Sequence, residues 1–182
     1  MRMHRRLVVV AWILALFAGL STAAPSAANG TTPYSANFPN EETVFRPCPP
    51  GVPTGSICFT GSDHSGQGNS TPPGTTATED FAGFVDLSQA TPTPCPDGST
   101  GHPDHNVVAI STPAGRLFLT TNGTDCISTG HDHGVWQAHG GTGIFEGASG
   151  SGTVDTQATG GSGTSGDPIL SSSTYTGTLT LN

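Results

Sequence analysis

The sequence contains no lysine and has very little positive charge of any kind. Only 10% of its 182 residues are charged, and five arginines form the whole basic complement apart from histidine. Three of these arginines lie within the first six residues, so Arg46 and Arg116 alone stand against all 13 acidic residues, a formal charge of −11 beyond residue 28. Nucleic-acid binding by counterion release needs several Lys or Arg side chains on one face. We therefore predict that this protein does not bind nucleic acid.

The chain has a single long apolar run, and it is short for a membrane span. This run, Leu7–Leu20, follows the basic start Met1–Arg6 and precedes small residues ending at Ser26-Ala27-Ala28. Its 14 residues would form a helix of about 21 Å, whereas the hydrocarbon core of a bilayer is about 30 Å thick. The pattern favours a secretory signal peptide over a transmembrane anchor. We expect residues 1–28 to be that signal, and the mature protein to be extracellular and free of the membrane.

A helical apolar periodicity is missing as well, so long helices are not expected. Short β-prone runs alternate with Gly, Pro, Asn, Asp and Ser instead. In the clearest strand, Ser173–Leu181, apolar residues and glycine alternate with threonine, as in a half-buried antiparallel strand. The other expected strands are Ser56–Gly61, Asp80–Leu87, Asn106–Thr112, Arg116–Thr121, Thr124–Ser128, Val135–His139 and Gly152–Ala158. About eight strands in roughly 130 residues predict one all-β domain, either a sandwich or a small closed barrel.

Cysteine is scarce, and all four cysteines lie beyond the expected signal. An even number in an exported chain predicts two disulfides, for which three pairings exist. We favour Cys48–Cys58, which would close a Pro/Gly-rich loop, together with Cys95–Cys126, which would tie Cys95 to a later strand edge. A zinc site is the alternative for four cysteines, but the sequence has no C-x-x-C pair.

A glycine-rich segment, Gly140–Thr153, has the sequence GGTGIFEGASGSGT. It is not a dinucleotide fingerprint, because Glu146 stands where the third glycine belongs, and without lysine it is not a phosphate-binding loop. It also lacks the last glycine of the G-x-S-x-G nucleophile elbow. Glycines at this density allow sharp bends between strands, so we predict a structural role. The residues of this motif are Gly140, Gly141, Gly143, Phe145, Gly147, Gly150 and Gly152.

The pattern GGTG-x-F-x-GA-x-G-x-G, followed by a threonine-rich final strand, resembles secreted bacterial members of the allene oxide cyclase barrel-like group. That group is related in fold to plant dirigent proteins, and the segments CPPGVPTGSICF and Thr124-Asp125-Cys126 are also similar to its secreted members. The resemblance covers about Cys48–Leu181. It implies an eight-stranded antiparallel barrel that binds hydrophobic small molecules or guides a cyclisation, and it supplies no catalytic motif. Residues 29–42 are polar and show no periodic pattern, so we expect them to form a flexible segment that precedes a barrel domain over residues 43–182.

Histidine is unusually frequent for a chain without lysine, with six beyond residue 28. Two short motifs, H-P-D-H and H-D-H, bring imidazole and carboxylate groups together, and such groups bind zinc or copper. The candidate ligands are His102, His105, His131 and His133. The alternative is that these histidines are polar loop residues, in which case we expect no cofactor.

Adjacent acidic residues, Glu41-Glu42 and Glu79-Asp80, are expected at solvated strand ends, because neighbours on a strand point to opposite faces. We predict that the barrel binds an uncharged, hydrophobic small molecule, since the acidic chain would repel anions. One alternative is a cyclase or isomerase that orders a flexible substrate by shape, and another is an extracellular metal-binding or structural protein. A cavity holding a paired acid or base with a perturbed pKa would favour the enzyme.

Overall fold

A computed structural model describes residues 30–182, and the expected signal peptide lies outside the described residues. The strands are β1 (Gly30–Arg46), β2 (Ser56–Asp63), β3 (Asn69–Thr71), β4 (Thr75–Thr76), β5 (Thr78–Asp86), β6 (His102–Thr112), β7 (Gly115–Cys126), β8 (His131–Gly141), β9 (Ser149–Gly160) and β10 (Ile169–Leu181). A single 3₁₀ turn, η1 (Gly143–Phe145), lies between β8 and β9. Within the described residues, no helix has the length and apolarity needed to cross a bilayer.

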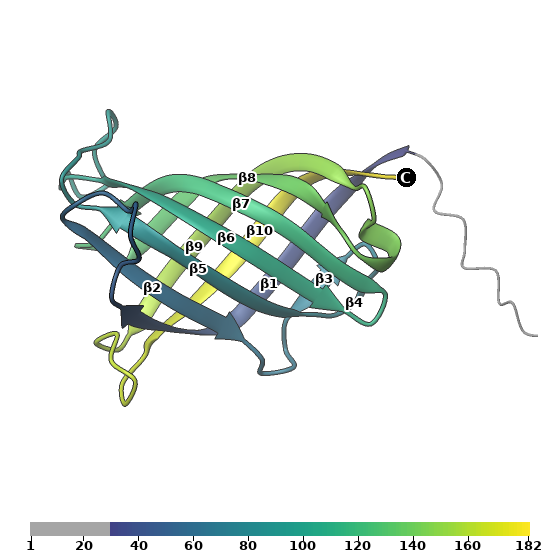
Figure 1. The fold of residues 1–182 in the computed structure, drawn as a ribbon, viewed down its shortest axis with the longest axis horizontal. Helices are drawn as coiled ribbons and strands as arrows, with labels where there is room; N and C mark the ends of the chain where they lie inside the picture. The colour runs from purple at the N-terminus through teal and green to yellow at the C-terminus, as the bar shows by residue number, and fades with distance from the viewer. Residues whose placement is uncertain (1–29) are drawn as a thin grey trace, which may run out of the picture.

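Eight of these strands form a closed antiparallel barrel (Figure 1). Their order around the barrel is β1-β2-β5-β6-β7-β8-β9-β10, and pairing of β10 with β1 closes the sheet. The small hairpin β3-β4 lies beside the first part of β1, while the last part of β1 pairs with β2. The expected all-β barrel is confirmed, and the strand predictions fall on β2 and on β5 to β10.

The polar segment expected to be flexible, residues 29–42, needs a correction, because residues 30–42 belong to β1. Tyr34, Ala36 and Phe38 alternate with polar residues and point into the barrel, where they are at most 2% exposed. Strand β1 pairs with β10 along most of its length. Three alternating apolar residues suffice for a strand that has sheet neighbours on both edges. The barrel therefore begins at Gly30 in the described part of the chain.

A packed core fills one half of the barrel interior, at the end that carries η1 and the C-terminus (Figure 1). Trp136 lies at its centre, in edge-to-face contact with Tyr34 at a ring-centroid distance of 5.3 Å, and its Nε1 donates a hydrogen bond to the Thr176 carbonyl at 3.1 Å. Aromatic pairs of this geometry stabilise a core beyond the area that they bury. The other large side chains of this core are Phe38, Ile110, Leu117, Leu119, Phe145, Tyr175 and Leu179.

The glycine motif forms the connection between β8 and β9 at this filled end. Gly143 adopts a positive φ of 62°, which any other residue adopts only with strain, and opens η1. Phe145, the last residue of η1, is fully buried in the core. The motif therefore turns the chain while it anchors the turn in the core.

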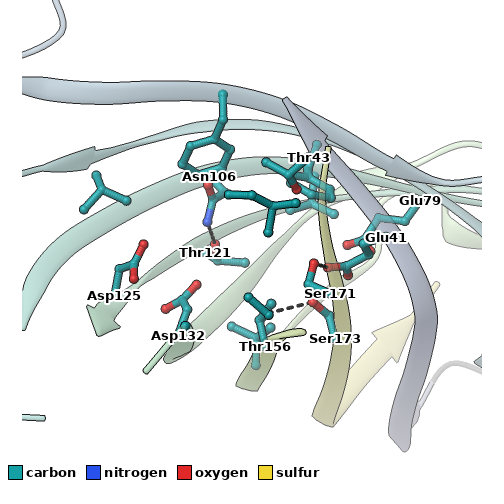
Figure 2. Close-up of a pocket in the computed structure, with 18 of the residues that line it drawn as sticks. Glu41, Thr43, Glu79, Asn106, Thr121, Asp125, Asp132, Thr156, Ser171 and Ser173 are labelled. Atoms are coloured by element: carbon teal, nitrogen blue, oxygen red, sulfur yellow. Dashed lines mark hydrogen bonds between the residues drawn. The ribbon is translucent and has the colours of Figure 1, made fainter. Parts of the chain in front are cut away.

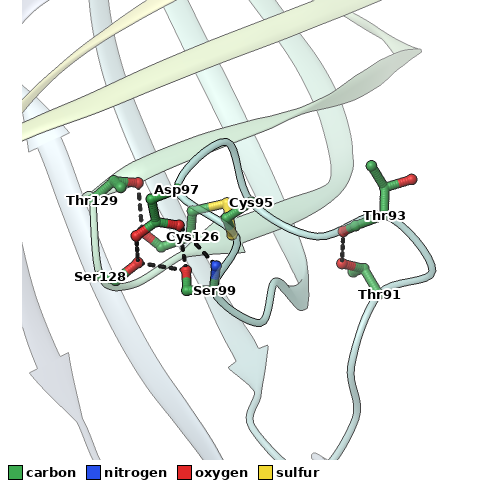
Figure 3. Close-up of a disulfide and its surroundings, with 8 residues drawn as sticks. All are labelled: Thr91, Thr93, Cys95, Asp97, Ser99, Cys126, Ser128 and Thr129. Carbon is green, nitrogen blue, oxygen red and sulfur yellow. Dashed lines mark hydrogen bonds between the residues drawn. A yellow bond between two sulfur atoms is a disulfide. The ribbon is translucent and has the colours of Figure 1, made fainter.

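Two disulfides join Cys48 to Cys58 and Cys95 to Cys126, as predicted. Both tie loops at the opposite end of the barrel, where the interior is not filled by the core. Around the second disulfide, Asp97 accepts hydrogen bonds from Ser99 and Ser128 and so links the β5–β6 loop to the β7–β8 turn (Figure 3). Disulfides of this kind are typical of proteins in oxidising, extracellular compartments.

Candidate functional site

The unfilled half of the barrel contains a cavity of about 340 Å³. Most of its wall is apolar, and aromatic side chains contribute much of it: Phe59 and Phe81 meet edge to face with ring centroids 6.3 Å apart. Phe45 and Ile127 lie at its mouth and are about half exposed. The remaining apolar wall consists of Ile57, Val85, Val108, Val154, Ala158 and Ile169. A cavity of this size with an apolar wall and a few polar groups is typical of a small-molecule site.

Two glutamates project into this cavity from β1 and β5 (Figure 2). Glu41 accepts a hydrogen bond from the Ser171 hydroxyl at 2.8 Å, and Glu79 accepts one from the Tyr175 hydroxyl at 2.6 Å. Glu41 is 1% exposed and Glu79 is fully buried. Burial raises the pKa of both carboxyl groups, and their contact with each other raises that of Glu79 further. The two glutamates therefore form a close, buried carboxyl pair in which burial favours the protonated form.

Three aspartates form a second acidic group on the neighbouring strands β6, β7 and β8, and two of them, Asp125 and Asp132, line the cavity. Burial raises the pKa of Asp125 to about 6. Burial, together with the charge of Asp125, also raises the pKa of Asp104 to about 6, and burial and the Asp104 charge raise that of Asp132 well above its ordinary value. Gly123 lies between Asp104 and Asp132, and a Cβ there would be 2.6 Å from Asp104 Oδ1. The missing side chain lets these two carboxyl groups approach each other.

No arginine or histidine is among the residues that line the cavity in the described part of the chain. Arg46 and Arg116 are exposed, and their Nε atoms donate to Thr60 and Ser111 on the barrel surface. The cavity is therefore an apolar chamber whose ionisable groups are four carboxyls and the phenol of Tyr175.

The four predicted histidine ligands do not converge on one point, although two of them are neighbours. His131 and His133 share the outer face of β8, where their rings stack 5.5 Å apart, and His131 contacts Asp155 at 2.9 Å. His105 contacts Asn122 at 2.8 Å, and His102 contacts the Gln89 carbonyl at 2.7 Å. Within residues 30–182, no group of three or more His, Cys, Asp or Glu side chains is placed to hold a metal ion. Binding of zinc or copper stays a prediction, which calorimetric titration of chelator-stripped protein would test.

The acids of the cavity were not predicted from the sequence, and the reason differs between them. Glu41 was expected at a solvated position, but a β-bulge between Phe38 and Glu41 reverses which residues face inward. Glu79 lies on a strand whose two faces are almost equally apolar, so alternation alone does not show that Glu79, Phe81 and Val85 form the inner face. The H-x-H pattern could have indicated that Asp132 faces the interior. Two histidines on the outer face of a strand place the residue between them on the inner face.

No known family model, curated protein or solved structure matches this chain.

Proposed function

We propose that this protein is a secreted barrel that binds a small, largely apolar molecule in the open half of its interior. The observation that best supports this proposal is the division of the barrel interior into a packed core and a cavity of about 340 Å³ with an apolar wall. A barrel with a purely structural role has no need to leave half of its interior empty. The motif similarity to the allene oxide cyclase barrel-like group and the count of eight strands support the same proposal.

Binding can be tested with the uncharged fluorescent probe prodan and a variant that fills the cavity. Ala158 lines the cavity on β9, so Ala158→Trp would place an indole in the ligand space. We expect its affinity for prodan to fall at least tenfold. The neighbouring Thr159 is exposed, and Thr159→Trp serves as the matched control with unchanged affinity. Equal binding by both variants would show that prodan does not occupy the cavity. Native mass spectrometry of protein purified from its own culture medium would then identify the natural ligand.

A second candidate function is a cyclase or isomerase that protonates its substrate, and the carboxyl pairs favour it. A carboxyl pair whose buried protonated form is favoured can donate a proton to a carbonyl or ether oxygen and accept another from carbon, so that an isomerisation needs no co-reactant. Glu79 is suited to this step because it is fully buried, hydrogen-bonded to Tyr175 and faces the cavity.

This second function would be tested by incubating the protein with small molecules extracted from its culture medium. An enzyme would convert one compound into another of the same mass and a different chromatographic retention. Glu79→Gln should abolish this conversion while prodan binding persists. If no compound changes with the wild-type protein, the binding function alone remains.

A further inference from the structure

The four carboxyl groups of the cavity have fewer hydrogen-bond donors than Asp86 at the end of β5 and Asp97 in the β5–β6 loop. Asp86 accepts hydrogen bonds from Ser88 and Gln89, and Asp97 accepts them from Ser99 and Ser128. The Ser88 and Ser99 hydroxyls hold the pKa of these two aspartates below its ordinary value. At these two positions the fold supplies the carboxylate with several donors.

The cavity acids are left with unpartnered oxygens. Within residues 30–182, no side chain or backbone N–H donates to Asp125, and Asp132 Oδ1 is buried without a donor. Oε1 of Glu41 and Oε2 of Glu79 are likewise buried without a donor, on side chains at most 1% exposed. A proton shared within each pair can satisfy some of these oxygens, but none is satisfied by the protein's own basic groups. Buried acceptors without donors are costly, so a donor from a ligand would be strongly favoured.

From this arrangement we infer that the ligand is an organic cation, a small apolar molecule with one ammonium group that lies between Asp125 and Asp132. This inference rests on the proposed binding function and names the class of its ligand. The ammonium would donate to both carboxylates, and the hydrocarbon part would pack against Phe59, Phe81 and Val154 on the cavity wall. Aromatic side chains also attract cations over their faces. The uncharged ligand expected from the sequence would leave the acids without partners.

None of the arginine or histidine side chains near these two aspartates lines the cavity in the described part of the chain. Two further carboxyl groups act on Asp132: that of Asp104 on β6 and that of Asp155 on β9, which does not line the cavity. His102 on β6 is the one base that acts on Asp125 in the described chain, and its Nδ1 contacts the Gln89 carbonyl. His131 and His133 lie on the outer face of β8, where His131 pairs with Asp155.

Calorimetry with three matched probes tests the inference: 2-phenylethylamine, 2-phenylethanol and 3-phenylpropionate. At pH 7.5 we expect the amine to bind at least tenfold more tightly than the alcohol, and the carboxylate more weakly than both. At pH 5 the amine should lose most of this advantage, because protonated aspartates no longer attract an ammonium group. Titrations in two buffers of different ionisation enthalpy should show that the amine releases protons when it binds.

Variants separate this inference from the proposed function. Asp125→Asn and Asp132→Asn should each reduce the preference for the amine at least tenfold while alcohol binding persists, which also shows that the variants are folded. Glu42 neighbours Glu41 but is exposed on the outside of the barrel, so Glu42→Gln is the control with unchanged preference. Equal affinity of the wild-type protein for amine and alcohol would overturn the cation inference and leave the binding function intact. Absence of binding by all three probes, together with prodan, would overturn both.

Discussion

At the scale of single residues, the close approach of two backbones to Trp136 explains why glycine occupies Gly152 on β9 and Gly177 on β10. These glycines pair with each other across the two strands, and a Cβ at either would lie 2.6 Å from the Trp136 indole. The largest side chain of the core therefore packs against a stretch of bare backbone. This contact gives a packing reason for one glycine of the conspicuous motif.

Gly152→Ala tests this packing. Its new methyl group would overlap the Thr176 carbonyl, the acceptor of the Trp136 hydrogen bond, and would also collide with the indole. We expect the free energy of unfolding in urea to fall by about 3 kcal/mol, from overpacking and the lost buried hydrogen bond. Gly160→Ala on the same strand is the control, because no atom lies within 4 Å of its Cβ position, and its effect should stay below about 1 kcal/mol. Equal effects of the two substitutions would contradict this explanation.

At the scale of elements, alternation predicted the strands well and failed where a strand is irregular. The final strand has Tyr175 and Leu179 inside and threonines outside, as its two-residue pattern predicts. In β1 the bulge inserts an extra residue, and the free N–H of Asn40 donates to Asp63 at 3.1 Å. A bulge is set by such local partners from another strand, and these cannot be identified from the pattern of one strand. Glu41, and with it half of the glutamate pair, was hidden for this reason.

The site was less predictable than the fold because it depends on which strands become neighbours. Asp104, Asp125 and Asp132 lie on three strands, and their grouping follows from the register in which Asp104 pairs with Gly123 and Asp125 with Asp132. In the sequence, Asp104 and Asp132 stand out only as the acidic residues of the H-P-D-H and H-D-H motifs. Period-two geometry places Asp132 on the face of β8 opposite to His131 and His133, and Asp104 on the face of β6 opposite to His105, whereas His102 shares the face of Asp104 at the end of the strand.

The two disulfides support the end of the barrel that has no packed core, and their removal should show this. The loop closed by Cys95–Cys126 spans 31 residues and that closed by Cys48–Cys58 spans 10. Loop-closure entropy gives about 3.7 and about 2.7 kcal/mol respectively. We expect the Cys95→Ala/Cys126→Ala variant to lose more stability in thermal denaturation than Cys48→Ala/Cys58→Ala, and to bind prodan more weakly. The opposite order of stability would show that chain entropy does not govern their contribution.

At the scale of the whole molecule, the chain is strongly acidic and the cavity inside its barrel is also lined by acidic side chains. Five carboxyl groups with raised pKa face or adjoin one cavity, whereas Asp86 and Asp97, which begin and occupy the β5–β6 loop, have lowered pKa. These two sets act in opposite directions on stability as pH changes. Protonation of the loop aspartates removes stability at low pH, and ionisation of the cavity acids removes it as pH rises.

The free energy of unfolding should therefore fall between pH 5 and pH 8, contrary to the trend of proteins whose acids form salt bridges. A carboxyl whose pKa is raised in the folded state keeps its proton in the folded protein, while the same group in the unfolded chain loses its proton near pH 4. The stability that this group contributes is therefore fully present below about pH 4. It is lost as pH rises through the pKa of the folded state. For Asp104 or Asp125, a change from 3.8 to about 6 corresponds to about 3 kcal/mol in all, of which about 1.4 kcal/mol is lost between pH 5 and pH 8. Because the neighbouring carboxyl groups interact, their contributions do not simply add. Urea denaturation at pH 5 and at pH 8 measures this change in the free energy of unfolding.

Glu79→Gln, which mimics the protonated acid, should flatten the pH dependence, and Glu42→Gln on the outer face should not. A stability that is constant or rises from pH 5 to pH 8 would mean that the cavity acids ionise without cost, and the cavity would then hold enough water to solvate them.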